Sequence, residues 1–127
     1  MERTKEEAAV FWAVHCLDHP DAANRRAAAR AEHSARLARL RDTGTGPRVL
    51  LYGPLLGPDG ETQVGSLFLV EAGHLAAVED FVDQDPFSTG DVWGVVDIRA
   101  FTPSGNSVVT LPVTPETPEP RRPPTPI

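Results

Sequence analysis

The chain has 127 residues, enough for one domain, and a formal net charge of -6, which gives no electrostatic case for binding nucleic acid. No apolar stretch approaches the roughly 20 residues that a membrane-spanning helix needs, so we expect no membrane partner. Cys16 is the only cysteine, which excludes an internal disulfide, and the charged start of the chain lacks the apolar run of a signal peptide. These features predict a cytoplasmic protein.

Proline is unevenly distributed along the chain. Eight of the 13 prolines lie from Pro103 onward, where large apolar residues become scarce. Such a composition cannot build a core. We therefore predict a charged leader at 1–9, a folded domain at 10–102 and a proline-rich tail at 103–127. The tail should be mostly disordered, although residues 108–111 could add one short strand.

The first half of the predicted domain begins with a strand. Residues 10–17 are apolar on both alternating faces, which is typical of a central strand. A helix is predicted from Ala22 to Asp42, with Asp21 and Asn24 as candidate N-cap residues. The run Thr43-Gly44-Thr45-Gly46-Pro47 should end it.

A hairpin and a second helix follow. Residues 48–52 form a strand that Gly53-Pro54 should end, and a turn at 57–60 leads into a strand at 65–70. The second helix should end before Asp85-Pro86, because proline disfavours a helical residue before it. Its apolar face comprises Leu75, Val78, Phe81 and Val82. Residues 92–101 make the last strand.

This order of elements predicts an α+β fold. It is the ferredoxin-like βαββαβ arrangement, a split βαβ in which both helices cover one face of a four-stranded antiparallel sheet. Strict alternation places Val49 and Leu51 on one face and Leu50 and Tyr52 on the other, so both sheet faces are apolar. The face without helices then needs a cover, and we expect a homodimer that packs sheet against sheet. Cover by the chain's own tail is the alternative.

The first predicted helix carries polar groups on its apolar side. Arg26, Arg30 and His33 share one stripe with Leu37 and Leu40, because helical neighbours lie three or four residues apart. If the leucines point into the core, the polar side chains point toward an interior or a cleft. The stripe therefore predicts a small-molecule site.

Several short motifs occur in a characteristic order. They are Asp18, Arg26-x-x-x-Arg30-x-x-His33, Gly53-Pro54, Gly65-Ser66 and Asp83-Gln84-Asp85-Pro86-Phe87. With them the chain resembles the YciI-like (YCII-domain) family from about Trp12 to Phe101. The resemblance implies a dimeric α+β barrel with an active site around His33 and Asp85. One family member eliminates chloride from a chlorinated hydroxyhydroquinone. Ala100 departs from the family pattern, which commonly has proline before the last strand's phenylalanine.

The motif residues suit acid/base chemistry without a cofactor or metal. His33 would be the general base, and Asp85 would accept the proton of its other ring nitrogen and fix the tautomer. Arg26 and Arg30 would hold a carboxylate, phenolate or enolate, and Ser66 could line the pocket and donate a hydrogen bond. We expect a lyase, isomerase or cyclase that acts on a small anionic or phenolic ring compound.

Other interpretations of the same residues stay open. The inward-facing charges could form a buried ion network, the pocket could bind a metabolite without turnover, or the chain could be an interaction module. His15, Cys16, Asp18 and His19 resemble a metal cluster in composition, but His15 and Cys16 should point to opposite faces of a strand. Cys16 should be an inert core thiol.

Overall fold

The computed structural model describes residues 10–44 and 46–112, so the expected leader at 1–9 and the tail from 113 onward lie outside the described residues. Its strands form one antiparallel sheet in the order β2-β3-β1-β4. This confirms the α+β, ferredoxin-like prediction. The elements are β1 (Val10–Asp18), α1 (Ala23–Thr43), β2 (Arg48–Leu56), β3 (Gln63–Ala72), α2 (Leu75–Asp83), α3 (Pro86–Thr89) and β4 (Trp93–Phe101).

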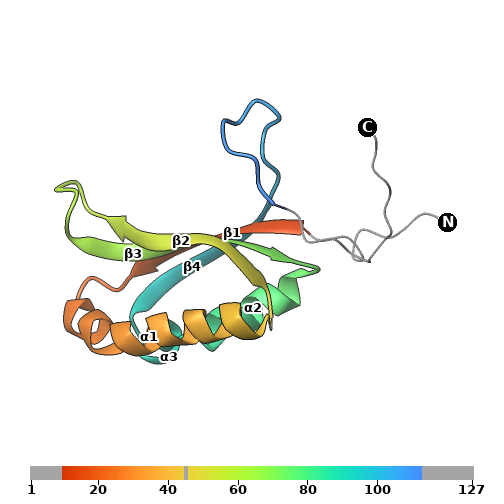
Figure 1. The fold of residues 1–127 in the computed structure, drawn as a ribbon. Helices are drawn as coiled ribbons and strands as arrows, with labels where there is room; N and C mark the ends of the chain where they lie inside the picture. The colour runs from red at the N-terminus through yellow and green to blue at the C-terminus, as the bar shows by residue number, and fades with distance from the viewer. Residues whose placement is uncertain (1–9, 45, 113–127) are drawn as a thin grey trace, which may run out of the picture.

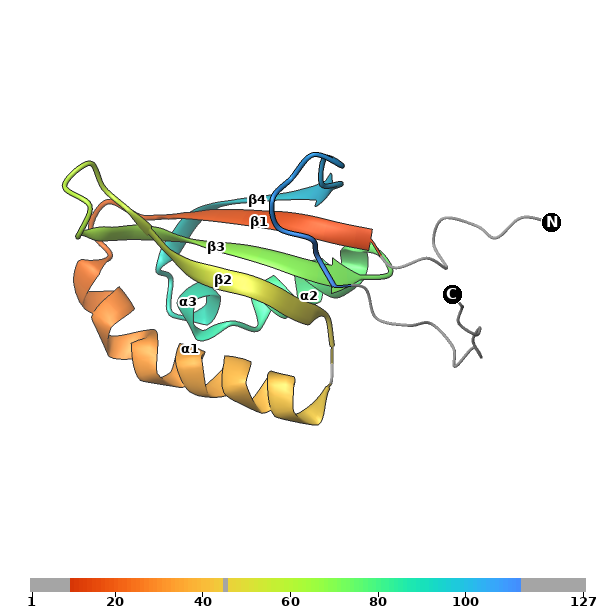
Figure 2. The same ribbon diagram turned by 45° about the horizontal axis from the view of Figure 1, so that its top comes forward.

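All three helices lie on the same face of the sheet (Figure 1). Figure 2 shows α1 running beneath β2 and β3, with α2 and α3 beside it. The core forms between these two layers, where Val14, Phe68, Val70, Val78 and Phe87 are at most 1% exposed. Each of these positions belongs to a helix or to the helix-facing side of a strand. Leu37 of α1 is buried in the same core, and this burial holds α1 and its polar stripe against the sheet.

The strand β2 is longer than predicted. It continues through Gly53 and Pro54 to Leu56, so the expectation that Gly53-Pro54 ends the strand is wrong. Because β2 is an edge strand, one of its sides has no strand partner, and proline is tolerated there. The hairpin turn comes later, at Gly57–Gly60, where Gly60 has a φ of 73°. The extension makes Gly53 and Pro54 part of the wall of a cavity that residues of α1 also line.

The helix ends also differ from the sequence interpretation. The N-cap of α1 is Ala22, which makes no side-chain cap hydrogen bond, and Asp21 instead accepts from Arg25 at 3.2 Å. At the other end Gly44 is left-handed and caps α1 as predicted. The short helix α3 was not predicted. It begins where Asp85, which follows α2, accepts a hydrogen bond from the backbone N–H of Phe87.

The sheet face opposite the helices, called the open face below, combines exposed apolar side chains with the polar side chains of His15, Asp97 and Arg99. A bulge between Val49 and Leu51 separates these two residues, which strict alternation had placed together. Val49 pairs with Val70 and packs against the core, whereas Leu51 pairs with Leu69. Exposed apolar side chains on the open face include Leu17 at 41%, Leu51 at 63%, Val95 at 60% and Phe101 at 42%. Leu67 is 40% exposed.

Beyond β4 the described chain, up to residue 112, has no regular structure (Figure 1). The strand expected at 108–111 is absent there, and Val108 is 99% exposed. Within this segment the Ser107 N–H donates to the carbonyl of Ser104 and closes a turn. None of the helices in the described parts is long and apolar enough to cross a membrane.

Gly65 of β3 pairs with Leu17 of β1 and lies close to the β1 backbone. A Cβ at this position would collide with the backbone carbonyl oxygen of Cys16, which cannot move without disturbing the sheet. We expect Gly65→Ala to lower the free energy of unfolding by about 2 kcal/mol. Chemical denaturation followed by circular dichroism measures this change. Gly53→Ala is the matched control, because nothing lies within 4 Å of its added methyl group, and equal losses in both variants would contradict the packing argument.

Candidate active site

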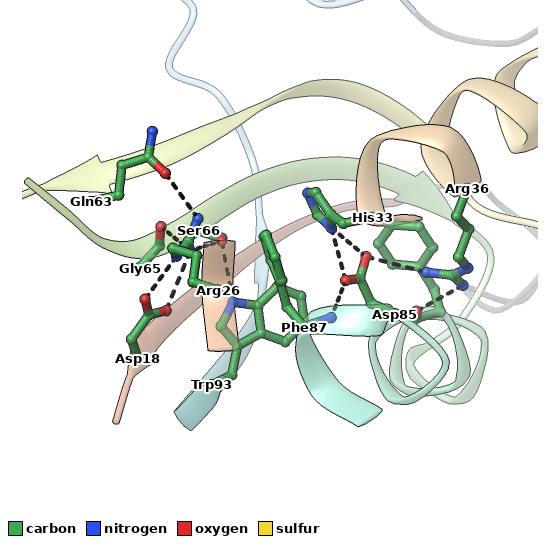
Figure 3. Close-up of polar contacts among 11 residues, drawn as sticks. Asp18, Arg26, His33, Arg36, Gln63, Gly65, Ser66, Asp85, Phe87 and Trp93 are labelled. Carbon is green, nitrogen blue, oxygen red and sulfur yellow. Dashed lines mark hydrogen bonds and ion pairs between the residues drawn. The ribbon is translucent and has the colours of Figure 1, made fainter. Parts of the chain in front are cut away.

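His33 of α1 contacts the carboxylate that follows α2. Its Nδ1 lies 2.8 Å and 3.0 Å from the two carboxylate oxygens of Asp85 (Figure 3). A carboxylate only accepts hydrogen bonds, so the contact assigns the proton of a neutral imidazole to Nδ1 and leaves Nε2 with a free lone pair. No hydrogen bond to Nε2 occurs within residues 10–44 and 46–112. The structure thus brings His33 and Asp85 into contact, and their roles as base and orienter stay a prediction.

Asp85 is completely buried, and its carboxylate has three partners. Besides His33 it accepts from the Phe87 N–H at 2.8 Å and from Arg36 Nη1 at 3.3 Å. Arg36 also donates to the carbonyl of Phe81 at 3.0 Å. Burial lowers the pKa of the Arg36 guanidinium from its ordinary value, and the charge of Asp85 opposes that shift. Asp85 is therefore charge-balanced independently of His33.

Arg36 was missed in the sequence analysis. It lies three residues after His33, which places it on the same side of α1, and this spacing was the available signal. Its contacts with Phe81 and Asp85 depend on tertiary packing, because these residues lie more than 40 positions away in the sequence. The side chain is 9% exposed, and its guanidinium lies 5.0 Å from the centre of the Phe81 ring.

Aromatic rings hold the imidazole in one orientation. The ring of His33 stacks on Phe87 with centroids 4.0 Å apart and an interplanar angle of 16°. Phe68 and Tyr52 meet it edge-on at 6.2 Å and 6.3 Å. Together with the Asp85 contact, this packing restricts rotation of the His33 side chain, which is 7% exposed. A base that is already oriented loses little entropy on binding a substrate.

Arg26 is occupied by contacts within the protein. Its Nε donates to Asp18 at 2.7 Å, and its Nη2 donates to the carbonyl of Gly65 and to the hydroxyl of Ser66, both at 2.7 Å (Figure 3). The guanidinium also lies 4.4 Å from the centre of the Phe87 ring. Arg26 is 5% exposed. The positive charge of Arg26 is thus already paired with the negative charge of Asp18.

Arg30, one turn further along α1, is in a different situation. It is exposed, and its Nη2 donates to the side-chain oxygen of Gln63 at 3.3 Å. The same oxygen accepts from Arg26 Nη1 at 3.5 Å. No ion pair of Arg30 with a carboxylate occurs in the part of the chain that the structure describes. Asp18 and Asp85 are each matched by an arginine, so Arg30 supplies the uncompensated positive charge near His33.

A cavity of about 140 Å³ lies between α1, β2 and β3. Four of the five predicted site residues line it, namely Arg26, Arg30, His33 and Ser66. Asp85 lies behind His33, outside the wall. The aromatic part of the wall comes from Tyr52, Phe68 and Phe87, and the extended part of β2 adds Gly53 and Pro54. The cavity thus has an aromatic wall and a small number of polar groups at defined positions.

The other chemical candidates in the sequence are not assembled into a site. Cys16 is fully buried, and burial, aided by Asp85 and Asp18, raises the pKa of its thiol to about 12, so the thiol stays protonated. His15 is exposed, and its side chain is on the face opposite Cys16. Over residues 10–44 and 46–112, no group of three or more His, Cys, Asp or Glu side chains could hold a metal ion.

Comparison with protein families identifies the domain that carries this site. The model of the YCII-related domain matches residues 10–102. The chain belongs to the YCII-related domain family. Over 97 residues this YCII-domain chain is 28% identical to Protein YciI of Escherichia coli O6:H1, a match that covers 72% of the chain and 96% of that protein. An uncharacterized protein of Haemophilus influenzae matches with the same identity and coverage.

A solved structure supports the fold of the YCII-domain chain. It is that of TftG, a 5-chloro-2-hydroxyhydroquinone dehydrochlorinase from Burkholderia phenoliruptrix, in complex with 2,5-dihydroxybenzoquinone. The TM-score is 0.62 at 24% identity, covering 72% of this chain and 93% of that one. This likeness bears on the fold alone, and it is the match of the YCII-related domain model to residues 10–102 that confirms the family resemblance seen in the sequence motifs.

Proposed function

We propose that this protein is a cofactor-free enzyme of the lyase, isomerase or cyclase type that acts on a small anionic or phenolic ring compound. The observation that supports this most strongly is the His33–Asp85 pair, in which one ring nitrogen is held by a buried carboxylate and the other is free. A histidine in this state can remove a proton from a bound molecule and return it at another position. Loss of a leaving group, migration of a double bond or ring closure would follow from the same proton transfer.

The wall of the cavity supports the class of substrate. A cavity of about 140 Å³ is close to the roughly 150 Å³ that accommodates a benzene molecule in an engineered protein core. Its aromatic side chains suit a planar ring, and the uncompensated charge of Arg30 suits an anionic substituent. The activity named for TftG, loss of hydrogen chloride from a substituted hydroquinone, is chemistry of this kind.

The test is a panel assay on the purified full chain. Chlorinated and unchlorinated hydroxyhydroquinones are incubated with the protein in D₂O, and chloride release and deuterium incorporation are followed. We expect saturable, protein-dependent conversion of at least one compound. Saturable binding with neither chloride release nor deuterium incorporation would instead identify a binding protein. The absence of both binding and conversion would favour the interaction module.

We also propose that the chain forms a homodimer through the open face. This face exposes Leu17, Leu51, Leu67 and Val95, and exposed apolar side chains gathered on a sheet face are normally covered. Light scattering should give about twice the chain mass of 13.7 kDa. Leu51→Glu should shift the protein toward the monomer. Leu75→Glu, on α2 and 41% exposed, is the matched control that should leave the mass unchanged, and a monomeric wild type would contradict the proposal.

A further inference from the structure

The Ser66 hydroxyl has an unusual set of partners. Ser66 is part of β3, is 3% exposed and lines the cavity. Its Oγ lies 2.7 Å from Arg26 Nη2 and 3.2 Å from Trp93 Nε1. Figure 3 shows both nitrogen atoms directed at the same oxygen.

Both partners can only donate hydrogen bonds. Neither a guanidinium nor an indole N–H has a lone pair to offer, so the Ser66 oxygen must accept from both, which uses its two lone pairs. The hydroxyl hydrogen is then restricted to the remaining tetrahedral direction. No acceptor for it occurs among residues 10–44 and 46–112. A buried donor without a partner costs stability, which a ligand in the adjoining cavity would recover.

We propose that the Ser66 hydroxyl is a fixed hydrogen-bond donor for an ionised oxygen of the bound ring, a phenolate or an enolate. Arg26 then acts as a positioning residue, because it orients and polarises Ser66 instead of contacting the ligand as a free cation. This inference rests on the proposed ligand site and specifies its substrate class.

The surrounding charges favour this arrangement. Arg26 is itself paired with Asp18 at 2.7 Å, so the chain Asp18–Arg26–Ser66 runs from a buried carboxylate to the cavity wall. Donation from a guanidinium makes the serine hydroxyl a better donor, since linked hydrogen bonds polarise one another. Because both lone pairs are engaged, the hydroxyl cannot rotate to accept from an amine or another pure donor. The site should therefore bind a ligand with an ionised oxygen more tightly than one whose group at that position can only donate hydrogen bonds.

The inference can be tested without a known substrate. The probe is 4-nitrophenol, whose ionised form absorbs at a longer wavelength than its neutral form, and 4-nitrotoluene is the comparison ligand without an oxygen on that carbon. Wild-type protein should bind the phenolate in preference to the phenol, which shifts the probe's ionisation to lower pH. Ser66→Ala should bind the phenolate roughly tenfold to a hundredfold more weakly, with unchanged affinity for 4-nitrotoluene.

Two further variants make the outcome specific. Trp93→Phe removes one of the two donors and frees a lone pair on Ser66, so phenolate preference should fall part of the way toward that of Ser66→Ala. Ser88→Ala removes a hydroxyl from α3, away from the cavity wall, and should leave the preference unchanged. Equal phenolate binding by wild type and Ser66→Ala, or no binding of the phenolate to wild type, would overturn the proposal. Since no turnover is measured, these outcomes are independent of whether His33 is a base.

Discussion

Replacing His33 by glutamine should slow turnover of a converted compound at least about a hundredfold, the usual contribution of a positioned general base. Glutamine keeps the approximate size of the side chain and can still donate to Asp85, but its amide cannot take up a proton near neutral pH. The loss should appear in kcat, while binding of the ring compound should change little. Steady-state kinetics on the panel compound, with circular dichroism to verify folding, measure both effects.

The control for this variant is His74→Gln. His74 precedes α2, is exposed and makes no side-chain cap hydrogen bond, so its loss should leave kcat unchanged. Turnover of His33→Gln at the wild-type rate would show that another group removes the proton. In that case the His33–Asp85 pair would have a purely structural role, as the ion-network interpretation holds.

Asp85→Asn should reduce both stability and activity. It leaves the guanidinium of Arg36 buried without a counter-charge, and breaking a buried ion pair from one side typically costs about 3 kcal/mol or more. It also removes the charge that stabilises a protonated His33 in the transition state. Urea denaturation measures the loss of unfolding free energy, and kcat on the panel compound measures the loss of activity.

A double-mutant cycle separates the two roles of Asp85. Arg36→Met combined with Asp85→Asn should cost clearly less stability than the sum of the single changes, because the double variant contains no unpaired buried charge. Activity should not recover in the double variant, since His33 still lacks its carboxylate. Asp83→Asn, an exposed change at the end of α2, is the control and should stay within about 0.5 kcal/mol of wild type. Simple additivity would refute the proposed pairing of Asp85 with Arg36.

The order of strands and helices along the chain could be predicted, because each strand and each helix has its own local pattern of apolar residues. Alternation within Val10–Asp18 and the recurrence of apolar residues in α2 reflect the geometry of a strand and a helix. The end of β2 could not be predicted this way. Gly53-Pro54 usually stops a strand, but the edge position of β2 in the sheet tolerates proline, and strand order is a property of the whole fold.

The candidate site was predictable to the extent that α1 alone defines it. Arg26, His33 and Leu37 are all buried on one side of α1, as helical spacing predicts. Helical spacing could not show that Arg26 and Arg30 have different partners. The two arginines are one turn apart, yet Arg26 is held by Asp18, Gly65 and Ser66, while Arg30 reaches only the Gln63 side chain.

The sequence by itself determined the fold class, the family and the residue types available for acid/base chemistry, because periodicity, turn residues and motif spacing are encoded along the chain. The tertiary structure decided which of those residues share a site. His33 and Asp85 are 52 positions apart, and Arg26 and Ser66 are 40 apart. Only the packing of α1 against β3 and α3 brings such distant groups within hydrogen-bonding distance, and that packing sets which charges are paired and which remain for a ligand.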